Sequence, residues 1–263
     1  MSFAPVLQEV AARISGDEPA TMREQPGRWA YSLREAVSLV APDWVVTHHD
    51  LDLEADAALA SGADLADAVD VPLDRSAPAS AALELTATLS TLYPRAVVAA
   101  SVSGPAAMAT RLLESGAEDL DPLDLLDLCG DALAGLAAAH IERGAQRVIV
   151  WEPSRGAFAA AEVEAAHRPL VRRLETLGVD AVLCSGFDLA GDGYAAHTSS
   201  SSSRAAVLVP LEAFPRNDDD DPSLVAKIEA APAGDVVLTD GPIPRDCSIG
   251  PLAQIGRRRG TTR

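Results

Sequence analysis

Lysine is almost absent from this chain: Lys227 is the only one, and all other basic residues are arginines. Acidic residues outnumber basic ones, 39 against 21, which gives a formal net charge of -18. Nucleic acids and anionic membrane surfaces bind concentrated basic faces, so this composition argues against both as partners. An aspartate-rich, lysine-poor chain is suited to a salt-rich cytoplasm, and a high-GC genome is the competing explanation.

Cysteine is also scarce, and no long apolar run occurs. Cys129, Cys184 and Cys247 are too few and too scattered for a disulfide framework, which agrees with a reducing compartment. No stretch of about 18 uninterrupted apolar residues exists, and the amino terminus resembles no leader peptide. We therefore expect a soluble, cytoplasmic protein with a small-molecule substrate, and a homodimer is compatible with these features. The length of 263 residues with 48% hydrophobic content predicts one domain over 1–263.

Strand-like and helix-like segments alternate along the chain. Apolar runs predict six strands, at 44–48, 95–102, 147–151, 180–184, 205–210 and 235–239. Helical periodicity and glycine or proline stops predict helices at 29–40, 51–68, 81–92, 105–115, 122–143, 158–177 and 222–230. This alternation predicts an α/β fold of parallel strands, either a doubly wound sheet or an eight-stranded barrel. A serine-rich segment at 191–204 predicts a flexible loop, and we expect a disordered tail at 256–263.

Polar side chains follow several of the predicted strands directly. His48, His49 and Asp50 follow the first strand, Glu152 ends the third, and Asp240 follows the last. Because the loops at the carboxyl ends of parallel strands converge on one mouth, these residues form the candidate site.

Each of these residues also has an ordinary interpretation. His48 and His49 point to opposite faces of an extended strand, so at most one faces the mouth. Asp50 is alternatively a helix amino-cap before Leu51. Glu152 is alternatively a solvated carboxylate.

The remaining histidines and Cys129 are weaker candidates. His140 and His167 lie within predicted helices, so we expect them to be surface or packing residues. His197 lies in the serine-rich loop, so we expect its side chain to be exposed. Cys129 predicts a core residue of its helix. No Gly-x-Ser-x-Gly elbow and no phosphate-binding glycine loop follows any strand, so hydrolase and nucleotide chemistry are unsupported.

Four segments stand out by their order along the chain. They are His49-Asp50-Leu51 with Glu54-Ala55; Val102-Ser103-Gly104-Pro105 with Met108 and Glu114-Ser115-Gly116; Gly144 through Pro153 continuing to Gly156; and Leu183-Cys184-Ser185-Gly186 with Asp240-Gly241-Pro242-Ile243. Together these segments resemble the superfamily of uroporphyrinogen decarboxylase and the related cobalamin-dependent methyltransferases. The resemblance covers roughly residues 40 to 255. It implies a (β/α)8 TIM-type barrel, complete or reduced and irregular, with its site at the carboxyl ends of the strands.

The decarboxylase branch of this superfamily implies one set of roles. Its strand-end aspartate, matched by Asp50, stabilises the positive charge that develops on a protonated pyrrole, as an ionised carboxylate can. Its amino-terminal arginine pair grips substrate carboxylates and is similar to Arg23 and Arg28. With His49 and Glu152 catalytic and His48 and Asp240 binding substrate, this reading needs no cofactor and predicts a lyase acting on a tetrapyrrole.

The methyltransferase branch implies different chemistry and a different cofactor set. Its members bind zinc through a histidine and two cysteines to activate a thiol, and they take the methyl group from a corrinoid partner. Cys184 and Cys247 are similar in position to the two cysteines, while Val182 stands where the histidine would be. His48, His49, Glu152 or His197 would have to complete a set of three. A third possibility is a non-catalytic barrel that binds a tetrapyrrole or a partner protein.

Overall fold

The computed structural model describes residues 2–60, 72–116, 120–198, 205–214, 228 and 236–260. Its strands are β1 (Ser2–Val6), β2 (Trp44–Val46), β3 (Val97–Ser103), β4 (Arg147–Glu152), β5 (Ala181–Ser185), β6 (Ala196–His197), β7 (Ala206–Val209) and β8 (Val236–Pro242). Its helices are α1 (Gln8–Ser15), α2 (Thr21–Glu24), α3 (Pro26–Val40), α4 (Leu53–Leu59), α6 (Ala77–Leu92), α7 (Pro105–Glu114), α8 (Pro122–Glu142), α9 (Ala160–Leu177) and α11 (Ile249–Gly260), with 3-10 turns η1 (Leu73–Arg75) and η2 (Leu211–Ala213).

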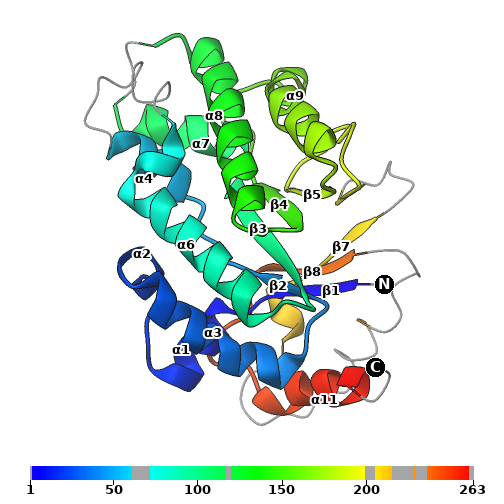
Figure 1. Cartoon of the computed structure of the whole chain (residues 1–263). Helices are drawn as coiled ribbons and strands as arrows, with labels where there is room; N and C mark the ends of the chain where they lie inside the picture. The colour runs from blue at the N-terminus through cyan, green and yellow to red at the C-terminus, as the bar shows by residue number, and fades with distance from the viewer. Residues whose placement is uncertain are drawn as a thin grey trace.

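All strand pairs in the described ranges are parallel and form two sheets (Figure 1). One sheet has the order β2-β3-β4-β5-β6 and the other β1-β8-β7. A parallel bridge between His197 and Ala205 links the sheets on one side. On the other side, the Asp43 N–H donates to the Phe3 carbonyl oxygen at 2.9 Å. Parallel strands joined by crossover helices confirm the predicted α/β class.

Helix boundaries follow the local signals in the sequence. Pro105 lies in the first turn of α7, where its missing N–H costs no hydrogen bond. The Asp121 carboxylate caps α8 by accepting the Leu123 N–H at 2.8 Å. Gly178 ends α9 with a φ of 66°, a left-handed conformation that favours glycine. These three boundaries agree with the predicted helices.

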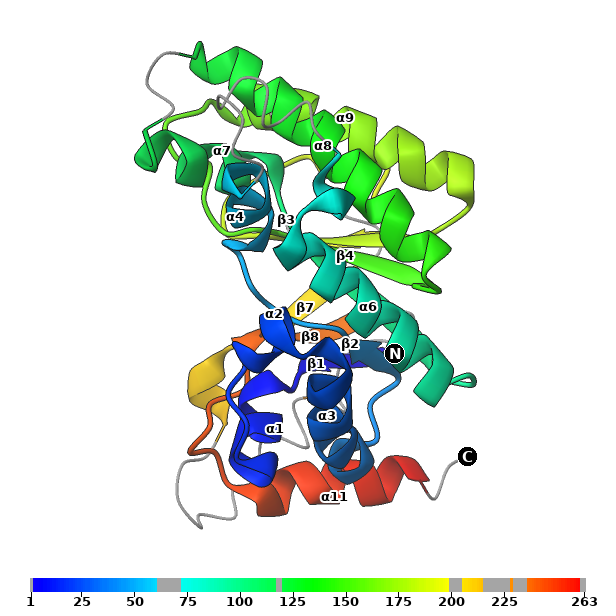
Figure 2. The same ribbon diagram turned by 60° about the vertical axis from the view of Figure 1, so that its left-hand side comes forward.

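The strands bury apolar side chains on both faces, as parallel strands with covering helices do. One set consists of buried side chains that come only from the strands of the two sheets. Its members include Ala4, Trp44, Ala99, Ile149, Trp151, Val182, Cys184 and Leu238. The other set packs against helices and includes Val98, Val150 and Leu183. Figure 2 shows α7, α8 and α9 on the side of β3 and β4, and α1, α3 and α11 on the side of β1.

Two strands and three helices of the described residues were not expected, namely β1, β6, α1, α2 and α11. β1 was missed because a five-residue segment containing Pro5 gives a weak strand signal, yet Phe3 and Ala4 are fully buried. β6 lies inside the segment predicted as a flexible loop, and the predicted exposure of His197 is wrong, because its side chain is 6% exposed.

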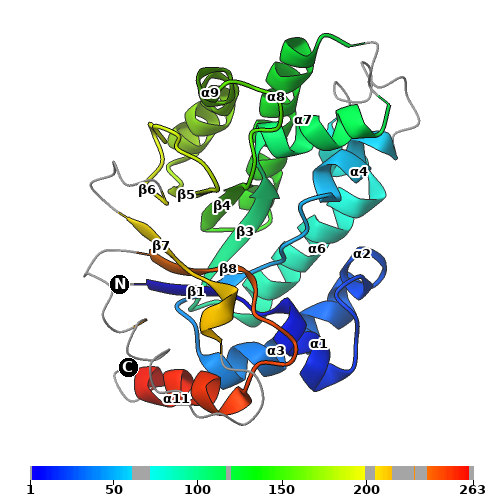
Figure 3. The ribbon, with the colours of Figure 1, turned by 180° about the vertical axis from the view of Figure 1, so that it is seen from behind.

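α11 extends to Gly260, into the segment 256–263 for which we expect a disordered tail. The helix packs against α3, and its Leu252 is fully buried (Figure 3). The predicted helix at 222–230, the serine run at 199–203 and the second half of the helix at 51–68 lie outside the described residues, apart from Ile228. No helix among the described residues is both long and apolar enough to cross a membrane.

Candidate functional site

His49 and Trp151 form the centre of the candidate site. Their rings meet edge to face with centroids 4.7 Å apart and planes at 78°. Trp151, near the end of β4, donates its indole N–H to the Ser101 hydroxyl on β3 at 2.8 Å. The Gln8 side chain accepts the His49 N–H at 2.9 Å and donates to the His49 carbonyl at 3.1 Å, which fixes this part of the loop after β2. Three strands therefore contribute to one cluster at their carboxyl ends.

Two carboxylates act on the His49 ring. Burial lowers the pKa of His49, while its backbone hydrogen bond and the nearby Asp50 and Asp240 carboxylates oppose that shift. The net lowering keeps the imidazole neutral at pH 7, so that it can accept a proton. Asp240 itself is exposed at the rim of the cluster.

Cys184 lies on β5 in the apolar set between the strands. Burial raises the pKa of its thiol, and the Asp240 carboxylate adds to the rise. Cys184 is therefore a protonated thiol at neutral pH and a poor nucleophile.

Arg23 joins Asp50 to helix α4. It lies 2.7 Å from the Asp50 carboxylate and 2.6 Å from that of Asp56. Asp50 also accepts the Asp52 N–H at 3.3 Å, one residue before α4 begins. Asp50 therefore stabilises the turn that leads into α4 and pairs with the Arg23 guanidinium. It is not the amino-cap expected before Leu51, because α4 begins at Leu53 with Asp52 at its N-cap. Arg28, by contrast, is exposed and pairs with Asp17.

His48 lies on the other side of its strand, away from Trp151. Its Nδ1 is 2.9 Å from the Thr47 hydroxyl, and its ring faces that of His140 with centroids 6.3 Å apart. Burial lowers the pKa of His48 to about 4 and that of His140 to about 3. Both rings are therefore neutral, buried packing residues. The alternative of a surface role for His140 is wrong.

Glu152 also points away from His49, because consecutive strand residues alternate in direction and Trp151 occupies the inner face. Its carboxylate accepts the Ala106 and Ala107 N–H groups at the start of α7, at 3.0 and 2.8 Å. His167 of α9 lies 3.3 Å from the same carboxylate. The structure thus puts Glu152 behind the strand and fully buried, neither at the mouth nor solvated.

Glu54 is a further candidate that we did not single out from the sequence. Its carboxyl accepts the Ser103 N–H at 3.1 Å at the end of β3, and its second oxygen has no hydrogen-bond partner. Burial raises its pKa to about 7. A carboxyl that titrates near neutrality at a strand end is a feature of functional sites. In the sequence, Glu54 stood out only as part of the segment His49-Asp50-Leu51 with Glu54-Ala55 that resembles the superfamily, and it was given no role there.

Cys184 and Cys247, the two predicted metal ligands, form no metal site within the described residues. Cys247 lies in the connection between β8 and α11, where its carbonyl accepts the Arg13 guanidinium at 2.5 Å, and burial raises the pKa of its thiol to about 11. In the described part of the chain, no three His, Cys, Asp or Glu side chains come together so that they could hold a metal ion. The residues present there do not fit the zinc site that the resemblance implies.

No family model matches this chain, and no curated protein matches it in sequence. Its structure is similar to that of a methyltransferase from Methanosarcina mazei, with a TM-score of 0.70. The match covers 98% of this chain and 94% of the other, at 16% sequence identity. At this identity the likeness establishes a shared fold over nearly the whole of both chains.

Proposed function

We propose that the two sheets together form a (β/α)8-type barrel. Three observations support this: the strands neighbour one another in chain order from β2 to β6, β8 lies between β1 and β7, and contacts at His197 and at Asp43 link the two sheets. In such a barrel the carboxyl ends of the strands carry the chemistry. His49, Trp151 and Asp240 lie at those ends.

We further propose that the protein transfers methyl groups. The single observation that carries this proposal is the likeness to a methyltransferase over almost the full length of both chains. That likeness supports the methyltransferase branch of the predicted superfamily and gives no support to porphyrinogen decarboxylation. Fold alone does not fix a reaction, so the argument also rests on what the cluster at His49 can do.

His49 is the proposed general base. The methyl group is transferred without its bonding electrons. The bond between the methyl carbon and the donor atom breaks, and its electron pair stays on the donor. The acceptor supplies the electron pair of the new bond. The acceptor, a thiol or similar nucleophile, loses its proton to the neutral His49 imidazole. Asp50 and Asp240 then stabilise the imidazolium, because opposite charge favours the protonated ring.

Trp151 and Gln8 are proposed as positioning residues. The edge-to-face contact with Trp151 and the two hydrogen bonds from Gln8 to the His49 backbone restrict the imidazole to one orientation. Fixed orientation of a base lowers the barrier to proton transfer. We derive no step through zinc. A methylated corrinoid, which would supply an electrophilic methyl group when bound, stays a prediction from the family resemblance.

An assay with labelled methyl donors tests this function. The protein, purified in chelator, is given methylcobalamin or a methylsulfonium donor together with a small thiol, and label in the thioether is measured. We expect transfer, and we expect Asp240→Asn to slow it. Asp52→Asn, which removes an exposed carboxylate paired with Arg111, is the matched control and should transfer normally. Absence of transfer from every donor would favour a non-catalytic binding barrel instead.

A further inference from the structure

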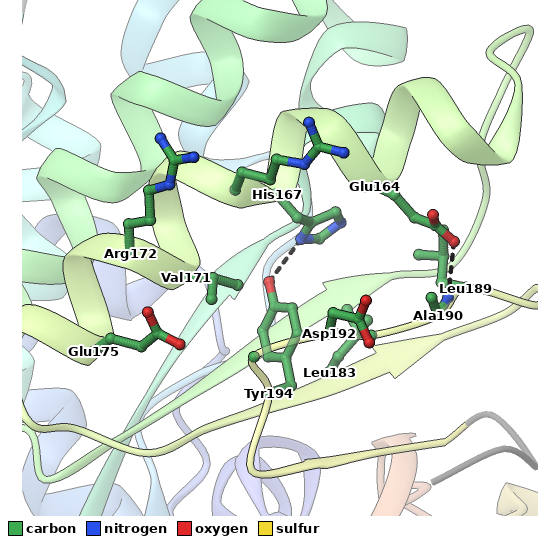
Figure 4. A pocket seen from close by; sticks show the side chains of 13 residues that line it. Glu164, His167, Val171, Arg172, Glu175, Leu183, Leu189, Ala190, Asp192 and Tyr194 are labelled. Carbon is green, nitrogen blue, oxygen red and sulfur yellow. Dashed lines mark hydrogen bonds between the residues drawn. The ribbon is translucent and has the colours of Figure 1, made fainter.

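The flank of the fold holds a cavity whose charges are of both signs. It has a volume of about 270 Å³ and lies between α9 and the connection from β5 to β6 (Figure 4). Its charged lining residues are Arg168, Arg172, Glu164, Glu175 and Asp192. Such a lining favours neither a cationic nor an anionic ligand. The cluster at His49 differs, because it has an exposed carboxylate, that of Asp240, at its rim.

Asp240 stands on a bulge at the end of β8. Between two paired positions of the strands, the single residue Pro5 of β1 opposes the three residues 239–241 of β8. The Thr239 hydroxyl holds this bulge, because it accepts the Val6 N–H at 3.0 Å. Bulges occur next to functional sites, where they change the direction of a side chain.

The bulge brings the end of β8 against the His49 ring. A Cβ on Gly241 would lie 4.0 Å from Cε1 of His49, which is ordinary van der Waals contact. The Asp240 carboxylate, one residue earlier, makes no ion pair with any residue that the structure describes. Burial lowers the pKa of His49 and raises that of Cys184, and the Asp240 charge opposes the first shift and adds to the second. The carboxylate is therefore close enough to act on both side chains.

The cation beside Asp50 is already paired. Arg23 lies 2.7 Å from the Asp50 carboxylate and 2.6 Å from that of Asp56. One positive charge thus stands against two negative ones. An anionic ligand would have to displace one of these carboxylates to pair with Arg23, and Asp240 would repel it. A cationic ligand would be attracted by Asp240 and would leave the Arg23 pairs intact.

We propose that the acceptor methylated at His49 is a small thiol that carries an ammonium group. This inference rests on the proposed methyl transfer. The thiol proton passes to the His49 imidazole, and the sulfur forms the bond to the methyl carbon as the bond from that carbon to the donor breaks. The electron pair of the broken bond stays on the donor. The ammonium group lies at the Asp240 carboxylate and keeps its protons, and its charge is the feature by which the site selects among thiols.

Three thiols that share one HS–CH2–CH2 arm test this proposal. They are 2-aminoethanethiol, 2-mercaptoethanol and 3-mercaptopropionate, which end in an ammonium, a hydroxyl and a carboxylate at pH 7. Binding to the full chain is followed through the NMR signal of the His49 Cε1–H, which is identified by its loss in His49→Gln. We expect 2-aminoethanethiol to bind roughly twofold to fivefold more tightly than 2-mercaptoethanol, and 3-mercaptopropionate to bind most weakly. Higher ionic strength should reduce these differences.

Two variants assign the preference to the proposed carboxylate. Asp240→Asn removes the charge at the rim, so the three thiols should bind with similar affinity. Asp180→Asn removes one charge just before β5, at the opposite end of the strands, and should keep the wild-type order of affinities. Circular dichroism confirms folding of both variants. The wild-type order in Asp240→Asn, or no change of the His49 signal with any thiol, would overturn the proposal.

The methyl-transfer assay separates this inference from the proposed function. Transfer with equal kcat/KM to 2-aminoethanethiol and to 3-mercaptopropionate would refute the inference and leave methyl transfer standing. Selective binding of 2-aminoethanethiol at His49 with no transfer from any donor would refute methyl transfer and leave an ammonium-selective thiol site.

Discussion

Glu54 couples the stability of the protein to pH. Its folded-state pKa of about 7 lies above the ordinary 4.5, so the native state holds a proton that the unfolded chain releases. The free energy of unfolding therefore has its full Glu54 contribution below pH 4.5 and falls as the pH rises toward about 7. The loss is at most roughly 3 kcal/mol, because one pKa unit corresponds to about 1.4 kcal/mol.

Replacing Glu54 with glutamine removes this titration. The amide keeps an oxygen for the Ser103 N–H and carries no charge at any pH. We expect Glu54→Gln to be more stable than the wild type at pH 8 and close to it at pH 5, measured by urea unfolding. A stability difference of the same size at both pH values would contradict the proposed protonation of Glu54.

The candidate site could be predicted only in part at the level of residues. Strand ends were the right place to look, and His49, Asp50 and Asp240 lie close together there. Glu152 was assigned to the mouth because the exact end of β4 decides which residue faces inward, and a shift of one residue reverses the face. In the structure Trp151 is the residue that faces inward. Glu152 faces the helices, where its carboxylate accepts backbone N–H groups of α7 and lies close to His167.

At the level of elements, the contact between α8 and α9 depends on one glycine. A Cβ on Gly130 of α8 would overlap the Ala166 carbonyl oxygen of α9, which is backbone and cannot rotate away. Gly130→Ala should therefore destabilise the protein by roughly 1–3 kcal/mol as the helices are forced apart.

Gly135 on the same helix provides the matched control. An added Cβ there has no neighbour within 4 Å, so Gly135→Ala should stabilise the protein by about 0.5–1 kcal/mol through higher helix propensity. Thermal unfolding of both variants measures the two effects. Equal shifts of both melting temperatures in the same direction would be inconsistent with close packing at Gly130.

Elements with strong periodicity and clear stops were predictable, and short ones were not. Helices α3, α7, α8 and α9 have apolar stripes bounded by proline or glycine, so local sequence specifies them. β1 and β6 are held mainly by their neighbours: β1 by pairing with β8, and β6 by pairing with β5. Such tertiary contacts leave little trace in a single sequence.

At the scale of the whole molecule, Asp43 links the two sheets at one of their junctions. Its carboxylate accepts the Phe3 N–H at 2.7 Å, beside the backbone hydrogen bond between the same residues. Asp43→Ala should lower the free energy of unfolding by roughly 1–3 kcal/mol, because a partly buried N–H loses its acceptor.

Asp180→Ala is the control for this change. It removes an exposed carboxylate 3.3 Å from Arg147 and should cost about 1 kcal/mol or less. Urea unfolding of both variants compares the two. A loss for Asp43→Ala no larger than for Asp180→Ala would show that the Asp43 contact contributes little to joining the sheets.

The proposed role of His49 as a general base is tested most directly by one measurement. It is the pH dependence of methyl transfer by the wild-type protein and by His49→Gln. Because burial holds the pKa of His49 below 6.5, the wild-type rate should fall only in acid, as the imidazole becomes protonated. At pH 7.5 we expect His49→Gln to transfer roughly 10²- to 10⁴-fold more slowly. A His49→Gln protein that transfers methyl groups at the wild-type rate, with the wild-type pH profile, would contradict the proposed site.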